Sequence, residues 1–196
     1  VRDWYLPRLT MLTAALLPFS WLFRGVVGAR RALYRSNALG TARLPVPVIV
    51  VGNIAAGGTG KTPLVVWLAR ALRERGLHPG IVSRGHGGNY GPARAVRADD
   101  DPRAAGDEPL LLVRAGSPVW IGRDRVAAAG GLLGTHPEVD VIISDDGLQH
   151  YRLRRAVEIV VVDGQRGFGN GALLPAGPLR APWSRAGTVD AIVVNG

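Results

Sequence analysis

Short apolar runs alternate with segments of helical periodicity along most of the chain. Runs rich in β-branched residues lie at 46–51, 80–83, 118–121, 139–143, 157–163 and 189–194. Between the first two runs, apolar residues recur at helical spacing: Leu64, Val65, Leu68, Ala69 and Leu72. Further helices are expected over 110–114, opened by Gly106-Asp107-Glu108-Pro109, and from 125 to about 134. Near-continuous apolar strands separated by helices predict an α/β fold, with a mostly parallel sheet and helices on both faces.

The first 35 residues follow a different pattern. Residues 9–23 are almost wholly apolar, but the run includes Pro18 and is shorter than the roughly 20 apolar residues that a spanning helix needs. Side chains suited to lipid headgroup depth lie in or around it: Arg2, Trp4, Tyr5, Arg8, Trp21, Arg24, Arg30, Arg31 and Arg35. A helix lying in the membrane interface fits best; the alternatives are a buried core helix and a spanning helix or signal. We therefore predict a membrane-interface region over 1–35 and a nucleotide-binding domain over 36–196.

A glycine-rich segment follows the first predicted strand and precedes a helix. It consists of Ala55, Ala56, Gly57, Gly58, Thr59, Gly60, Lys61 and Thr62. Glycines let backbone N–H groups converge on a phosphate, and the dipole of the following helix favours an anion at the same point. The Lys61 ammonium would reach the β- and γ-phosphates, and the Thr62 hydroxyl would bind Mg²⁺. The segment is therefore predicted to be a phosphate-binding loop with all eight residues in contact with nucleotide.

Two features bear on this prediction. Ala55 occupies a position at which the full phosphate-loop pattern has glycine. In the other direction, Lys61 is the only lysine, since all other basic residues are arginine. Lysine is a compact point charge that fits inside such a loop, whereas arginine is a planar fork. The alternative of a glycine-rich turn without a ligand is therefore the weaker interpretation.

Two pairs of acidic residues are candidates for chemistry. Asp145 and Asp146 directly follow an apolar strand, where the partner acids of a phosphate loop hold Mg²⁺. Adjacent carboxylates repel unless a cation lies nearby, so both are predicted metal ligands. Asp107 and Glu108 open a helix and are either dipole partners or a general base and Mg²⁺ organiser. The role of His150, four residues further on, stays open.

Composition limits the classes of partner. The net charge of +9 and the isoelectric point near 11.2 indicate an anionic partner or an arginine-rich solvated surface. The absence of cysteine excludes disulfides and thiolate chemistry. Aromatic residues are few and do not alternate with the arginines, so no nucleic acid is expected. The chain starts at Val1 and ends in a predicted strand, so we expect it to be truncated at both ends.

Taken together, the motifs resemble the tetraacyldisaccharide 4'-kinase family, the lipid A 4'-kinases. The resemblance rests on the phosphate loop with Val51-Gly52-Asn53 before it and on five further motifs: Ser83-Arg84-Gly85, Gly106–Pro109, Gly122–Arg125, Ser144–His150 and a last motif made of residues 166–171 and 174–180. It implies an ATP- and Mg²⁺-dependent kinase. The γ-phosphate would pass to the 4'-hydroxyl of a tetraacyldisaccharide 1-phosphate, a lipid A precursor. The location would be the membrane surface at the cytoplasmic face of a Gram-negative inner membrane.

The resemblance also implies residue roles. Lys61 and Thr62 would bind nucleotide and metal, and Asp145 and Asp146 would be the metal-side acids. Asp107 would be the base or would orient it, so Asp107, Lys61 and Asp146 form the expected catalytic set. His86 stands where a tyrosine is expected. The family continues into a smaller C-terminal domain, so this chain is expected to bind nucleotide but to turn over poorly.

One other class of function fits part of the pattern. A partner-regulated P-loop NTPase of the partitioning or metallochaperone type would use the same Gly-Gly-Thr-Gly-Lys-Thr loop. The apolar N-terminal segment and the run from Asp145 to His150 do not suit that class. Hydrolysis stimulated by a protein partner, with no lipid acceptor, would favour it.

Overall fold

The computed structural model describes residues 2–6, 8–85 and 92–196. It divides into two compact units, which are considered separately. The terminal unit comprises Val1–Gly40, Asn53–Gly60 and Ile159–Gly196, and the central unit comprises Thr41–Gly52 and Lys61–Glu158. The predicted loop over 84–91, with His86, lies mostly outside the described residues. The predicted boundary at residue 35 stays a prediction.

The central unit is built on a mostly parallel sheet, as the apolar runs predict. Its strands are β1 (Val48–Gly52), β2 (Pro79–Ser83), β3 (Arg94–Val96), β4 (Val119–Ile121) and β5 (Val141–Asp145). They lie in the order β3-β4-β2-β5-β1, and only β3 pairs antiparallel with its neighbour. Every residue of β2 and of β5 is buried. Pattern reasoning missed β3, because three residues reading Arg-Ala-Val are too short to carry a period.

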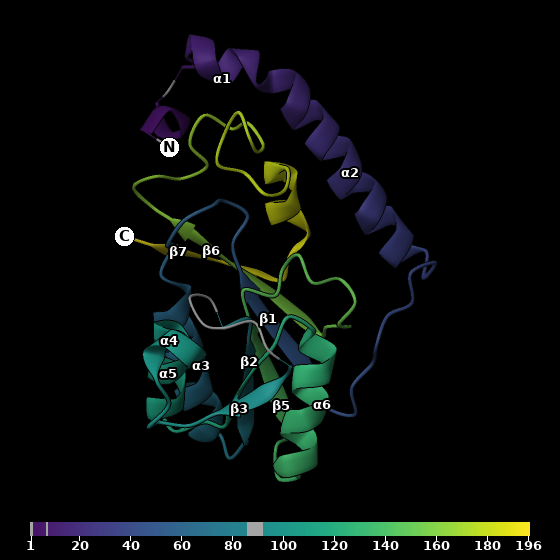
Figure 1. Ribbon diagram of the computed structural model, residues 1–196, viewed down its shortest axis with the longest axis vertical. Coiled ribbons are helices and arrows are strands. Elements are labelled where there is room, and N and C mark those ends of the chain that lie inside the picture. The colour runs from purple at the N-terminus through teal and green to yellow at the C-terminus, as the bar shows by residue number, and fades with distance from the viewer. Residues whose placement is uncertain (1, 7, 86–91) are drawn as a thin grey trace. The chain divides into compact units, whose positions relative to one another are not determined.

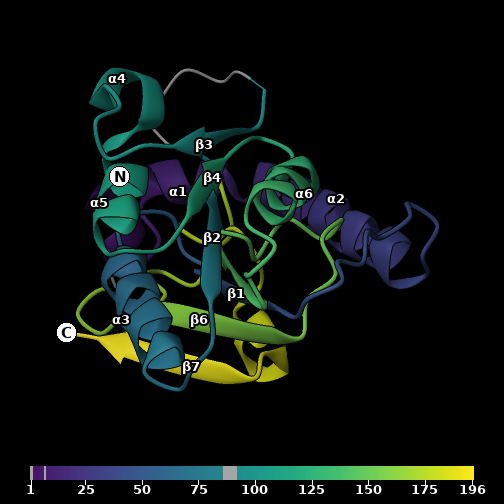
Figure 2. The same ribbon diagram turned by 90° about the horizontal axis from the view of Figure 1, so that it is seen from below.

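Helices cover both faces of this sheet. Figures 1 and 2 show α3 (Lys61–Arg73) and α5 (Asp107–Arg114) against one face and α6 (Arg125–Thr135) against the other; the short α4 (Pro102–Ala105) packs on α5. Asp124 is the N-cap of α6, since its carboxylate accepts the Val126 N–H at 2.9 Å and so pairs an amide of the first turn that has no partner within the helix. After α3, Gly76 takes φ +81°, and the Leu77 N–H returns to the Leu72 carbonyl at 3.1 Å, as in a Schellman cap.

The terminal unit holds the two ends of the chain. Strand β6 (Val157–Asp163) pairs in parallel with β7 (Ala191–Asn195) from Ile159 onward. Its helical segments are η1 (Arg2–Tyr5), α1 (Met11–Ala15), α2 (Leu17–Arg35) and η2 (Trp183–Thr188). None of the described helices is long and apolar enough to cross a membrane.

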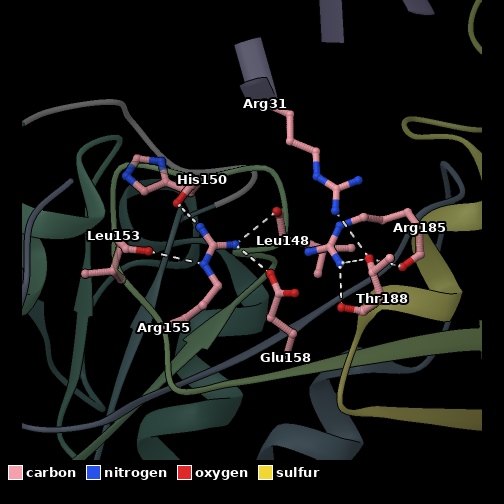
Figure 3. A network of polar contacts seen from close by, with 8 residues as sticks. All are labelled: Arg31, Leu148, His150, Leu153, Arg155, Glu158, Arg185 and Thr188. Carbon is pink, nitrogen blue, oxygen red and sulfur yellow. Dashed lines mark hydrogen bonds and ion pairs between the residues drawn. The ribbon is translucent and has the colours of Figure 1, made fainter. Parts of the chain in front are cut away.

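A polar contact joins the end of α2 to η2 within this unit. The Arg185 guanidinium donates to the Thr188 hydroxyl at 2.7 Å, and Arg31 of α2 donates to the same hydroxyl at 3.3 Å (Figure 3). Arg185 is 4% exposed and also donates to the Thr188 carbonyl at 3.3 Å. The contact fixes the far end of a helix whose length exceeds the predicted apolar run.

Candidate nucleotide-binding and catalytic site

The start of the predicted phosphate loop pairs with the Gly- and Pro-rich segment near the C-terminus. Ala55 forms an antiparallel bridge with Leu179. On either side of it, the Ala56 N–H donates to the Pro178 carbonyl and the Arg180 N–H to the Ile54 carbonyl, each at 2.7 Å. This segment therefore supports the loop, which explains why a long irregular stretch over 174–180 is kept in order.

Within the loop, glycine is required at two positions that do not include residue 55. Gly57 has φ +112° and Gly60 has φ +76°, conformations that L side chains rarely adopt. A Cβ on Gly60 would also lie 2.2 Å from the Asn195 side-chain nitrogen. Ala55 lies in an extended bridge instead, so the departure from the full glycine pattern has a structural reason.

Thr59 provides an unused polar group in the loop. Its side chain is 4% exposed, and its Oγ1 has no hydrogen-bond partner among the described residues. An unsatisfied buried hydroxyl is costly and calls for an explanation. A bound anion that accepts from this hydroxyl would supply one.

In the central unit, the helix that follows the loop brings a cation beside the paired acids. Lys61 is the first residue of α3, and its Nζ lies 3.7 Å from the Asp146 Oδ1, with side chains 14% and 22% exposed. Asp146 directly follows β5, and its φ of +49° is a conformation that aspartate tolerates better than most residues. Thr62, the next residue of α3, is half-buried.

Asp145 is the most unusual ionisable group of the site. It is 2% exposed, and the Ser83 hydroxyl donates to its Oδ2 at 3.3 Å. The other carboxylate oxygen, Oδ1, has no hydrogen-bond partner within the described ranges. The pKa of Asp145 is raised to about 6, chiefly by burial and then by the charges of Asp146 and Glu108, while Lys61 and Ser83 oppose the shift.

A buried arginine lies behind the acids. Arg125, at the start of α6, is 3% exposed and donates to the Gly122 carbonyl at 2.8 Å and to the Asp145 carbonyl at 3.3 Å. Burial lowers its pKa to about 10, while Asp145 and Asp146 act in the opposite direction. It therefore stays cationic at neutral pH and offsets part of the negative charge. The sequence analysis gave this residue no role.

The donor set fits a divalent cation that binds oxygen. Asp145 offers a buried carboxylate oxygen without a partner, and Asp146 and the Thr62 hydroxyl belong to the same unit. No group of three His, Cys, Asp or Glu side chains that could hold a metal occurs in the described part of the chain. A Mg²⁺ ion would therefore need phosphate oxygens and water as further ligands, which is how Mg²⁺ is usually bound.

The acidic pair at the start of α5 is less closely tied to these groups. Asp107 and Glu108 are both exposed. The charge of Glu108 acts on Asp145, whereas the Asp107 carboxylate has no hydrogen bond or ion pair recorded among the described residues. The structure thus brings together Lys61, Asp145 and Asp146, and adds Glu108; the assignment of Asp107 as base stays a prediction.

A sequence model described as Tetraacyldisaccharide-1-P 4'-kinase matches residues 12–196. The chain belongs to the tetraacyldisaccharide-1-P 4'-kinase family. It is 56% identical over 195 residues to the tetraacyldisaccharide 4'-kinase of Chromobacterium violaceum and 54% identical over 196 residues to that of Methylobacillus flagellatus. It covers 57% and 58% of the lengths of these relatives, and they match 100% of this chain. The chain therefore spans somewhat more than half of each.

A solved member of the 4'-kinase family has the same fold. The crystal structure of LpxK from Aquifex aeolicus, in complex with ATP, matches 94% of this chain and 59% of its own with a TM-score of 0.82 and 34% sequence identity. The predicted P-loop NTPase-like class and the predicted family are confirmed.

Proposed function

We propose that the protein containing this chain transfers the γ-phosphoryl group of ATP to the 4'-hydroxyl of a tetraacyldisaccharide 1-phosphate, a precursor of lipid A. The observation that carries the proposal is the meeting of Lys61 with Asp146 beside the buried Asp145, in a chain of the 4'-kinase family. A lysine at the end of a glycine-rich loop and acids at the end of a neighbouring strand are the parts that phosphoryl transfer needs.

The residues of the chain would act mainly by positioning and by neutralising charge. The loop amides and Thr59 would hold the phosphates, and the Lys61 ammonium would stabilise negative charge on the β- and γ-oxygens. Asp107 would accept or steer the proton of the acceptor hydroxyl. Its exposed position at the start of α5 leaves it accessible to a substrate.

Thr62, Asp145 and Asp146 would hold Mg²⁺. When bound, the ion would neutralise negative charge on the phosphates. The buried Asp145 is suited to this role because its charged form is destabilised without a cation. Arg125 would keep the Asp145 backbone in place through its bond to the carbonyl.

The N-terminal helices support a membrane surface as a second partner. The buried residues of α1 and α2 are the polar Thr13 and Ser20. The Ser20 hydroxyl donates to the Leu173 carbonyl at 2.8 Å and accepts the Ala176 N–H at 3.0 Å. Large apolar side chains of the same helices are exposed instead: Met11, Leu12, Phe19, Trp21, Leu22, Val26 and Leu33. This distribution supports a helix at a lipid interface over a buried core helix.

Such a surface is typical of a helix that lies in a lipid interface. Exposed arginines accompany it at 8, 24, 30 and 35, where each could add about 1 kcal/mol near an anionic leaflet. We propose that the protein works at the cytoplasmic face of a Gram-negative inner membrane, where ATP and an acylated substrate meet. No nucleic-acid partner is proposed.

Acceptor dependence of ATP consumption tests the proposal against the partner-regulated NTPase. The full-length protein is incubated with Mg²⁺ and ATP in detergent micelles, with or without tetraacyldisaccharide 1-phosphate, and ADP release is measured. A kinase releases ADP in proportion to the lipid added. ADP release that does not depend on the lipid would contradict the proposal and favour the partner-regulated NTPase.

A further inference from the structure

Four consecutive carbonyls of the phosphate loop each accept a hydrogen bond from a side chain. The Tyr5 hydroxyl donates to the Ala56 carbonyl at 2.9 Å, and the Asn53 Nδ2 donates to the Gly57 carbonyl at 3.1 Å. The next two bonds come from the Arg166 Nη2 to the Gly58 carbonyl at 2.7 Å and from the Asn195 Nδ2 to the Thr59 carbonyl at 3.4 Å. All four donors and the loop belong to the terminal unit.

These bonds determine the direction of the loop amides. In a trans peptide the C=O and the N–H of one peptide group point in opposite directions. The carbonyls of residues 56–59 share their peptide groups with the N–H groups of residues 57–60. Side chains that hold these carbonyls therefore also fix the direction of the four N–H groups, and N–H groups that converge on one point bind an anion.

The four donors come from separate parts of the chain and support one another. Arg166 is held in place by Asp163, whose Oδ2 accepts the Arg166 Nε–H at 2.7 Å. The same guanidinium lies over the ring of Tyr5, 5.8 Å from its centroid. Tyr5 belongs to η1, which is fixed by the bond from the Asn170 N–H to the Trp4 carbonyl at 2.8 Å.

Asn195 acts on the loop by contact as well as by its hydrogen bond. Its amide occupies the space next to Gly60 in which a Cβ would lie, so it packs directly against the last residue before Lys61. Its backbone carbonyl accepts the Gly164 N–H at 2.8 Å, which ties the end of β7 to the turn after β6. The side chain is therefore held against the loop by the strand pair.

We infer that Tyr5, Asn53, Arg166 and Asn195 are positioning residues that preorganise the phosphate loop by holding its carbonyls away from the ligand. This inference rests on the proposed nucleotide binding and deepens it. Without the bonds, the loop carbonyls are free to turn toward the phosphates, and ATP must restore the arrangement when it binds. The loss therefore falls on affinity for the polyphosphate.

The experiment measures Kd by calorimetry for two probes, ATP and inorganic tripolyphosphate, each with Mg²⁺, on the full-length protein. The variants are Tyr5→Phe, which removes one hydroxyl and keeps the ring, Arg166→Met, and Asn195→Leu, which is neutral, similar in size and has no donor. The matched control is Tyr34→Phe, because Tyr34 also carries an arginine over its ring, at 5.9 Å, but lies in α2. The melting temperature of each ligand-free variant is recorded.

Each variant is expected to bind ATP about three- to tenfold more weakly, the loss that one hydrogen bond predicts. Tripolyphosphate should weaken by the same factor, because the effect lies in the phosphate loop. KM for ATP should rise while kcat at saturating ATP changes less than about twofold, and the control should match the wild type.

Other outcomes distinguish a failure of the positioning inference from a failure of the proposed nucleotide binding. If the wild type binds ATP and all three variants bind both probes equally well, the positioning inference is overturned while nucleotide binding stands. If the loss of affinity in each variant only follows the decrease in melting temperature of its ligand-free form, the residues are structural and the inference is again overturned. If the wild type binds neither probe, the proposed function fails and the inference with it.

Discussion

The substitution Asp145→Asn separates the stability of the protein from its proposed chemistry. Asp145 is 2% exposed, and its pKa is raised from 3.8 to about 6, chiefly by burial and then by the neighbouring acids. Above that pKa the native protein must keep a destabilised charge. Asparagine has the same shape, can still accept the bond from Ser83, and carries no charge. The variant should therefore be more stable than the wild type at neutral pH.

The size and direction of the effect follow from proton linkage. A carboxyl with a raised native pKa binds its proton more tightly when folded, so the wild type loses stability as pH rises from about 4 to about 6. At 1.36 kcal/mol per pKa unit, the advantage of the variant grows from less than about 1 kcal/mol at pH 4 to about 2 kcal/mol at pH 5 and about 3 kcal/mol at pH 7.5.

Urea unfolding of the ligand-free proteins across this pH range measures the difference. Asp99→Asn is the control, because the Asp99 side chain is 75% exposed and its replacement removes no desolvation cost. Saturating Mg²⁺ and ATP should reverse the order, since a bound cation stabilises the charged carboxylate. A variant that is no more stable than the wild type at pH 7.5, or whose advantage does not change with pH, would refute the reasoning.

Further expectations concern the loop, an ion pair and the membrane surface. Gly60→Ala should lower the free energy of unfolding by about 1–2 kcal/mol because Gly60 has a positive φ. Gly58→Ala should cost less, because the space around Gly58 is open. Equal losses for the two variants would contradict this expectation. Arg155→Met should lower the free energy of unfolding by about 3 kcal/mol, since it removes the Arg155 bonds to Glu158 and to three carbonyls (Figure 3). The double variant Arg155→Met with Glu158→Gln should lose less. An equal loss of the two in urea unfolding would argue against the importance of this ion pair. Three exposed residues of α2 are replaced by serine: Phe19, Trp21 and Leu22. The affinity for anionic vesicles, measured by sedimentation, should fall about 100-fold, on the order of 1 kcal/mol per side chain. Unchanged binding would exclude this face as the membrane contact.

The fold was largely predictable because its strands are apolar runs, and β1, β2 and β5 are buried along almost their whole length. Strand β6 has the bounds that its apolar run predicts, while β1 starts two residues later than expected and β7 starts at Ala191 and ends at Asn195. The missed elements are short: β3, α4 and η2 each contain too few residues for a periodic signal. The long α2 was underestimated because its C-terminal half is rich in arginine and glycine.

The site was predictable only where a local motif encodes it. Lys61, Asp145 and Asp146 follow from the order of strand, loop and acid. Contacts between distant residues carry no such signal, so nothing in the sequence connects Tyr5 or Asn195 to the loop carbonyls. Likewise, the degree of burial that raises the pKa of Asp145 depends on packing around the end of β5.

The acids at the start of α5 show the same limit. The motif identifies Asp107 and Glu108 as a pair, and the resemblance selects Asp107. In the structure, Glu108 is the one whose charge acts on Asp145. Both carboxylates are exposed, so burial does not distinguish the two.

The most direct test is transfer of ³²P from γ-labelled ATP to tetraacyldisaccharide 1-phosphate in micelles by the full-length protein, with the position of the new phosphate read by mass spectrometry. Label is expected at the 4'-hydroxyl and should fall by orders of magnitude in Lys61→Ala, because the Lys61 ammonium no longer stabilises charge on the transferred phosphoryl group. Label that persists in Lys61→Ala, or ATP binding without any label on the lipid, would contradict the proposed function.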